Sequence, residues 1–184
     1  MPFPSRFKHC PNCGTAVEHL IPPDDNRVRA ICVACDSVHY QNPLNVVGTL
    51  PVWEADGSVL LCRRAIEPRR GLWTLPGGFM ELDETCAEGA LRETHEEAGA
   101  DVEMGALYTL LNVVRVGQIH LFYLARLRSL ALNPGPESLE ARMFTEAEIP
   151  WDDIAFKTTR ETLRCYFDDR RAGRAFALHS IDIS

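Results

Sequence analysis

Runs of apolar residues separated by short polar turns dominate the chain from about residue 46 onward. The apolar run 46–53, the Asp-Gly turn at 56–57 and the apolar run 59–62 predict a β-hairpin. Further apolar runs predict strands at 107–116 and 119–127, broken by a glycine, and a short strand around 142–144. The tail at 175–183 is expected to add an edge strand.

A first helix is predicted to begin at Thr85. Thr85 and Glu88 have the spacing of a capping box, in which each side chain bonds a free backbone N–H group of the first turn. Gly99 stands where a residue just past a helix end is expected. Small residues on one side of this helix would pack closely on a sheet.

A second helix is predicted to begin at Thr158, which forms a similar capping-box pattern with Glu161. Gly173 is expected to end it. Its apolar side is formed by Leu163, Tyr166 and Phe167. A mixed sheet with two flanking helices is an α/β fold of the α/β/α sandwich type.

Composition limits the kind of protein. The 184 residues are 46% hydrophobic and 24% charged, with a formal net charge of −7. These values are ordinary for a globular protein with one main domain and a small accessory one. The negative charge argues against nucleic-acid backbone binding. No apolar run approaches the ~20 residues of a membrane-spanning helix, and the first residues lack the apolar core of a signal peptide. We therefore expect a cytoplasmic protein that does not bind membranes.

Four of the seven cysteines form two Cys-x2-Cys pairs. Cys10 and Cys13 make the first pair, and Cys32 and Cys35 follow after 18 intervening residues. This spacing is typical of a structural zinc site with four thiolates and no open coordination position. A disulfide pair or a redox dithiol are the alternatives. Because so short a segment cannot build its own core, we expect Zn²⁺ to hold residues 1–42 together as a structural or dimer-forming ribbon.

Three glutamates share one side of the first predicted helix. At about 100° per residue, Glu93 and Glu97 lie one turn apart and Glu96 lies beside them. Like charges at this spacing repel, so a helix that gathers them suggests a site for a divalent cation. Ligands that are all oxygen favour Mg²⁺ or Mn²⁺ over zinc. The alternative is a solvated acidic face.

The stretch 78–100 resembles the Nudix box. The fixed positions of that motif are occupied by Gly78, Glu84, Arg92, Glu93, Glu96, Glu97 and Gly99. Its two apolar positions hold Thr94 and Ala100, which are smaller or more polar than the usual aliphatic residues. Together with the cysteine pairs, the segments 42–48, 61–69 and 135–140 are similar to the Nudix subfamily that carries a short N-terminal zinc ribbon. The resemblance covers nearly the whole chain.

This resemblance implies a zinc ribbon at 1–42 and a Nudix hydrolase domain at 43–184. It implies metal-dependent hydrolysis of the pyrophosphate bond in a nucleoside diphosphate linked to another group, with FAD and ADP-ribose as leading small-molecule substrates and AMP as a product. One alternative is an NADH pyrophosphatase, although the Ser-Gln-Pro-Trp signature of that group does not occur at 105–127. Another is a nucleotide sensor, which would not need the glutamates. Related enzymes often pair, so a homodimer is expected.

The resemblance also implies roles for individual residues. Glu93 and Glu97 are expected to be the principal metal ligands, helped by Glu96, and a carboxylate in or near this cluster would be the catalytic base. Glu140, outside the box, is expected to join the reaction centre. Arg92 is expected to orient the glutamates by ion pairing. The residues expected to contact the substrate are Arg64, Gly77 and Gly78.

Overall fold

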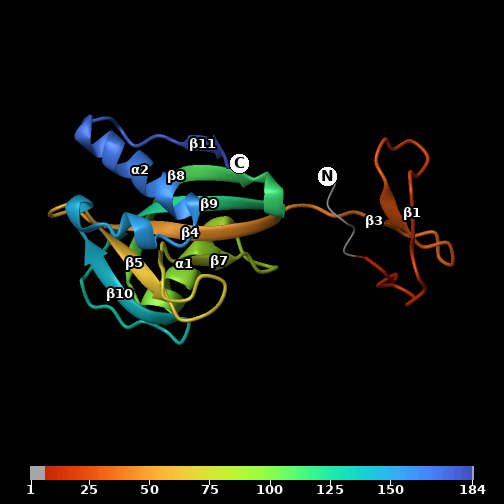
Figure 1. The fold of residues 1–184 in the computed structure, drawn as a ribbon, viewed down its shortest axis with the longest axis horizontal. Helices are drawn as coiled ribbons and strands as arrows, with labels where there is room; N and C mark the ends of the chain where they lie inside the picture. Colours follow the sequence, from red (N-terminus) through yellow and green to blue (C-terminus); the bar gives the residue numbers. More distant parts are fainter. Residues whose placement is uncertain (1–6, 184) are drawn as a thin grey trace. The chain divides into compact units, whose positions relative to one another are not determined.

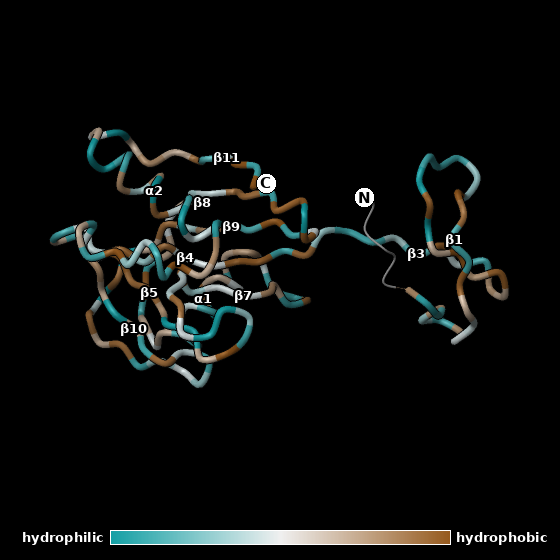
Figure 2. The backbone as a smooth tube through the Cα atoms, viewed as in Figure 1, coloured by the Kyte–Doolittle hydropathy of each residue, from teal (hydrophilic) through white to brown (hydrophobic). Residues whose placement is uncertain are grey.

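A computed structural model describes residues 7–183 of the chain. The chain divides into two compact units, Met1–Pro43 and Leu44–Ser184 (Figure 1). Residues 40–43 are hydrophilic and form the teal stretch that leads into the second unit in Figure 2. None of the described helices is long and apolar enough to cross a membrane.

The first unit contains a three-stranded antiparallel sheet in the order β1-β2-β3. Its strands are β1 (Glu18–Leu20), β2 (Arg29–Ile31) and β3 (Val38–His39). Cys10, Ala30 and Cys32 are buried, whereas Leu20 and Ile21 are about half exposed or more. So small a buried core contributes little stability, which is consistent with a unit that needs a bound ion to stay folded.

The second unit is built on an eight-stranded sheet with the order β10-β5-β4-β9-β8-β11, while β6 pairs with β5 and β7 pairs with β4. The pairs β4–β9 and β8–β11 are parallel and the others antiparallel, so the sheet is mixed. The strands are β4 (Leu44–Trp53), β5 (Ser58–Arg64), β6 (Trp73–Thr74), β7 (Gly77–Phe79), β8 (Val102–Val113), β9 (Gln118–Leu127), β10 (Ser138–Phe144) and β11 (His179–Asp182). The helical segments are α1 (Cys86–Ala98), η1 (Val114–Val116), η2 (Glu146–Glu148), η3 (Trp151–Asp153) and α2 (Lys157–Arg171).

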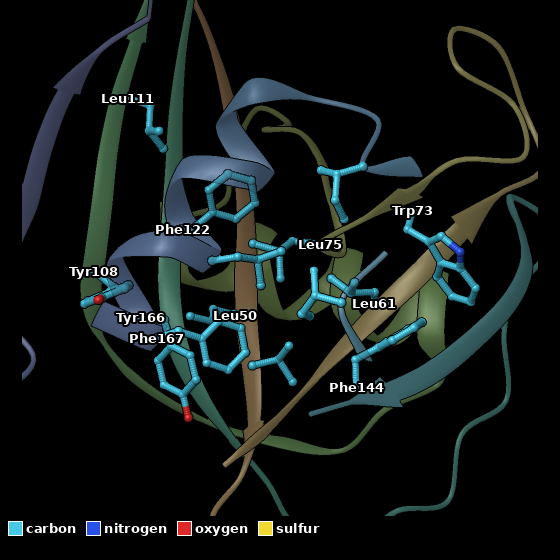
Figure 3. Close-up of a cluster of buried hydrophobic side chains, with 14 residues drawn as sticks. Leu50, Leu61, Trp73, Leu75, Tyr108, Leu111, Phe122, Phe144, Tyr166 and Phe167 are labelled. Atoms are coloured by element: carbon cyan, nitrogen blue, oxygen red, sulfur yellow. The ribbon is translucent and has the colours of Figure 1, made fainter. Parts of the chain in front are cut away.

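The two faces of this sheet carry separate hydrophobic cores. Along β5, Leu61 belongs to the core that includes Tyr166 and Phe167 of α2, whereas its neighbour Leu60 belongs to the core that includes Ala98 of α1. Successive side chains of a strand point to opposite faces, so one helix covers each face. Figure 3 shows the core on the α2 side. The expected α/β/α sandwich is therefore confirmed.

The first predicted helix is confirmed at both ends. Thr85 is the N-cap of α1, its hydroxyl accepts from the N–H of Glu88 at 3.2 Å, and the Glu88 carboxylate accepts from the N–H of Thr85 at 2.8 Å. Gly99 ends the helix in the left-handed conformation, with φ of 59°. Local sequence signals determine this helix because both of its ends are capped by their own side chains and backbone.

The second predicted capping box is wrong. Helix α2 begins at Lys157, and its N-cap residue, Phe156, makes no side-chain cap bond. Thr158 is buried and lies inside the helix. The hydroxyl of Thr159 instead lies 3.0 Å from that of Thr74 on β6. Packing of buried threonines against the sheet therefore takes precedence over the local capping signal.

The tail forms the expected edge strand, β11, which pairs with β8 in parallel. A buried carboxylate, Asp169 of α2, holds this part of the chain. It accepts hydrogen bonds from the hydroxyl of Tyr108 at 3.0 Å and from Nε of Arg174 at 2.8 Å, and Nε2 of His179 lies 2.7 Å from it. These contacts connect α2, β8 and the start of β11.

Candidate active site

The loop that contains β7 brings two glycines against two glutamates of α1. The N–H of Gly77 donates to Oε2 of Glu97 at 3.1 Å. A Cβ atom added at Gly78 would lie 2.5 Å from Oε1 of Glu93, closer than real Cβ contacts come. Glycine is needed at 78 because the Glu93 carboxylate occupies the space of a side chain.

Arg92 links the loop to the helix. Its guanidinium bonds both oxygens of Glu84, at 2.8 and 3.0 Å, and Nη1 also bonds Glu93 at 2.7 Å and Glu96 at 3.2 Å. Glu84 accepts a further bond from the N–H of Glu81 at 2.7 Å. The Arg92 guanidinium holds the pKa of Glu84 low, at about 2. These ion pairs hold Arg92 against Glu84, Glu93 and Glu96.

The three glutamates differ in how deeply they are buried. Glu97 is only 7% exposed, and burial raises its pKa to about 7, with the charge of Glu93 adding to the effect. Burial also raises the pKa of Glu93. The side chain of Glu96 is 57% exposed. Loss of solvation and the repulsion between neighbouring carboxylates both raise the free energy of their ionised forms. A bound cation would offset that free-energy cost.

The glutamates form an open set of ligands. A tightly gathered metal site would bring at least three ligand atoms of histidine, cysteine or carboxylate side chains within 4.8 Å of one another. Among residues 7–183, the four cysteines meet this condition. The three glutamates are not gathered that tightly. Mg²⁺ normally keeps several waters and is held by one or two carboxylates together with substrate phosphates. The oxygen-only set of Glu93, Glu96 and Glu97 fits such a site.

The four cysteines already have the arrangement of a closed site. Sγ of Cys10 lies 3.7 Å from Sγ of Cys35, and Sγ of Cys13 lies 3.4 Å from Sγ of Cys32. All four are free thiols. Zinc–sulfur bonds of about 2.3 Å in a tetrahedron separate the sulfurs by roughly 3.8 Å, so the set fits a Zn²⁺ ion. Nε2 of His39 lies 3.3 Å from Sγ of Cys10, as an outer ligand contact would.

One cleft of about 1460 Å³ collects most of the expected site residues. Those that line it are Arg64, Gly77, Gly78, Arg92, Glu93, Glu96 and Glu97. Phe156 and Lys157, at the start of α2, also line the cleft. The guanidinium of Arg64 lies 5.1 Å above the ring of Phe156, and its charge lowers the otherwise raised pKa of Glu97. The guanidinium of Arg64 and the buried carboxylate of Glu97 therefore line the same cavity.

Glu140 lies elsewhere. It is paired with Arg63 in the β10–β5 ladder and is not among the residues that line the cleft. Glu137, in the loop before β10, does line it, and its charge contributes to the raised pKa of Glu93 and of Glu97. In the sequence, Gly135-Pro136 indicates a turn just before Glu137. No sequence signal indicates how the following strand, β10, pairs with its neighbour in the sheet.

Comparison with known proteins identifies the family. Residues 43–164 match the NUDIX domain, and residues 8–41 match the zinc-ribbon family described as Nudix N-terminal. The chain belongs to the Nudix hydrolase family. Nudix hydrolases use divalent metal ions and act on nucleotide substrates, which agrees with the oxygen ligands in the cleft.

Three known proteins illustrate which members of the family this Nudix hydrolase is similar to. The crystal structure of a NUDIX hydrolase from Nitrosomonas europaea is 47% identical, has a TM-score of 0.90, and the match covers 96% of this chain and 99% of that one. An ADP-ribose pyrophosphatase from Methanocaldococcus jannaschii is 46% identical over 46 residues, 25% of this chain and 27% of that protein. A NAD-capped RNA hydrolase from Vibrio atlanticus is 32% identical over 98 residues, 52% of this chain and 33% of that protein. The matches span a third or less of the length of these last two relatives.

Proposed function

We propose that this Nudix hydrolase cleaves the pyrophosphate bond of a nucleoside diphosphate linked to a second group, with ADP-ribose and FAD as the leading substrates and AMP as a product. The observation that carries the proposal is the pair of carboxylates that lines a large cleft beside Gly77 and Gly78, Glu97 buried and Glu93 partly buried. The archaeal relative named an ADP-ribose pyrophosphatase supports the same substrate class.

In this proposal Glu93 and Glu97 hold the cation, Mg²⁺ or Mn²⁺, and the more exposed Glu96 assists. When bound, such a cation neutralises phosphate charge and lowers the pKa of water. Arg92 keeps Glu93 in place through their 2.7 Å bond. The backbone at Gly77 fixes Glu97 in the same way.

Two further groups act on the substrate. Arg64 lines the cleft and would bind the diphosphate, since its planar guanidinium suits phosphate oxygens. A carboxylate accepts the proton of the attacking water. Glu137 is a candidate for this base because it lines the cleft beside the cluster, and Glu140 remains the candidate from sequence.

The ribbon is proposed to bind one structural Zn²⁺ through its four cysteines, and the protein is proposed to be a cytoplasmic homodimer. Light scattering at micromolar concentration tests the oligomeric state, because a monomer mass would contradict it. A dimer through the ribbon would lose its dimer mass when residues 1–42 are removed, provided that the remaining domain stays folded.

A second candidate is hydrolysis of NADH or of NAD-capped RNA. The Vibrio relative with that name favours it, whereas the missing Ser-Gln-Pro-Trp signature disfavours it. A non-catalytic sensor is disfavoured because all three glutamates are present.

The test is a panel of FAD, ADP-ribose, NADH, diadenosine polyphosphates and nucleoside triphosphates, each with and without Mg²⁺. We expect turnover of ADP-ribose or FAD that requires the metal and is lost in Glu93→Gln. The matched control is Glu103→Gln, which alters an exposed carboxylate paired with Arg126 outside the cleft. No metal-dependent hydrolysis of any compound in the panel would refute the proposal.

A further inference from the structure

One row of side chains crosses the sheet at the floor of the cleft. Val46 of β4 pairs with Phe79 of β7 on one side and with His120 of β9 on the other. Residues paired across strands share a face, so the three side chains form a continuous row. All three line the cleft, and Phe79 is 51% exposed. This row is apolar and aromatic and contains one imidazole.

His120 carries an unusual polar atom. Its Nδ1 is buried and is the one buried side-chain nitrogen or oxygen without a hydrogen-bond partner among residues 7–183. Its Nε2 lies 2.9 Å from Oε1 of Gln118. Burial lowers the pKa of His120 to about 4, so the ring is neutral near pH 7. A neutral imidazole carries one proton, on one nitrogen or the other.

The environment selects the tautomer. A proton on Nδ1 would be a buried donor with no acceptor, which costs free energy, so the proton belongs on Nε2. Nε2–H then donates to Oε1 of Gln118, which fixes the orientation of the amide. Gln118 lines the cleft, so its NH₂ group and the second lone pair of Oε1 are available there. The histidine and glutamine together present one donor next to one acceptor.

We propose that Gln118, held in orientation by His120, binds the adenine of the substrate in the cleft, while the aromatic row supports the ring. Adenine offers a donor, its N6 amino group, beside an acceptor nitrogen, which is the complement of a carboxamide. On the edge that carries N6 and N7 in adenine, guanine offers two acceptors, N7 and O6, and has no donor for Oε1. Guanine presents a donor beside an acceptor only through N1–H and O6, and that approach would turn the base and displace its ribose and phosphate from the position that AMP takes. The inference rests on the proposed function for the substrate class, but it makes a separate claim about the base.

The test measures binding of AMP and GMP by calorimetry without added metal, so it does not depend on hydrolysis. We expect the wild type to bind AMP more tightly than GMP. Gln118→Met keeps the length of the side chain and should weaken AMP binding roughly two- to tenfold, with little change for GMP. Gln118→Glu supplies two acceptors, which suit the N1–H and N2 amino groups of guanine, and should shift the preference toward GMP.

Two further variants separate positioning from structure. His120→Phe should lower the AMP-to-GMP affinity ratio because Gln118 loses its fixed orientation. Gln41→Met changes the other glutamine of the chain, which does not line the cleft, and should leave the ratio unchanged.

Equal affinities of the wild type for AMP and GMP, no AMP binding, or an unaltered ratio in Gln118→Met would each overturn the inference. None of these results affects the proposed hydrolysis, which the Glu93→Gln turnover test decides on its own.

Discussion

Adding one methyl group at Gly78 should impair catalysis while sparing the fold. The new Cβ would lie 2.5 Å from the Glu93 carboxylate, and ordinary contact begins at 3.4 Å, so the carboxylate must move by about 0.9 Å. The atoms that it meets belong to the end of a flexible side chain, which can move at little cost in stability. A misplacement of about 1 Å in a reacting constellation can cost roughly 100-fold in rate. We therefore expect Gly78→Ala to lose about that much turnover with a nearly unchanged melting temperature.

The neighbouring glycine provides the matched control. A Cβ at Gly77 would meet backbone atoms, the carbonyl oxygen of Val47 at 2.8 Å and Cα of Gly48 at 3.0 Å, which cannot move independently of the sheet. Gly77→Ala should therefore lower the free energy of unfolding, by about 1–3 kcal/mol as overpacking usually does. Turnover against Mg²⁺ concentration and thermal unfolding of both variants check the difference. Normal turnover of Gly78→Ala at saturating metal would refute the placement of Glu93 in the reaction.

Three other outcomes test the site and the ribbon. Glu93→Gln should reduce turnover at least about 100-fold while the fold is kept, and Glu96→Gln should reduce it less because that side chain is more exposed. If the base is Glu137, Glu137→Gln should lower turnover with substrate binding retained, and Glu140→Gln should have little effect; the reverse result would assign the base to Glu140. Metal analysis should find about one zinc per chain, and its removal should increase hydrogen exchange in residues 7–42 before hydrolysis is lost, whereas a Cys10–Cys13 disulfide in fresh protein would contradict the zinc site.

The sequence predicted the parts of the site that are local. The capping box and Gly99 define α1, and the spacing along that helix places Glu93 and Glu97 together, so their shared position follows from helix geometry alone. The close approach of Gly78 to Glu93, where the carboxylate fills the space of a Cβ, required the structure.

Features that depend on sheet register could not be predicted. Gln118 and His120 enter the cleft only because β9 lies parallel to β4 and beside β8, and no short-range signal specifies that strand order. The same limit applies to Glu137 and Glu140: Glu137 lines the cleft and Glu140 does not, and the β10–β5 ladder has a register shift between Ser138 and Glu140 that no short-range signal specifies. The part of the site that the sequence left undetermined therefore depends on strand order and register, in the central strand β9 as well as in the loop before the edge strand β10.

The buried carboxylate of Asp169 should make the stability of the second unit depend on acid pH. Burial alone would raise its pKa, but the bonds from His179, Tyr108 and Arg174 outweigh burial and hold the pKa below its usual value. A carboxyl group with a lowered pKa in the folded state contributes stability that is fully present above its unfolded pKa, near 3.9, and is lost as the pH falls through the folded value. Asp169→Asn should therefore cost about 1.5–3 kcal/mol of unfolding free energy at pH 7, the value of hydrogen bonds to a charged group, and less at pH 3. Urea unfolding from pH 3 to 7 measures this, with Asp168→Asn, an exposed neighbour, as the control. Equal losses for Asp169→Asn at both ends of that range would show that Asp169 acts through packing and not through its charge.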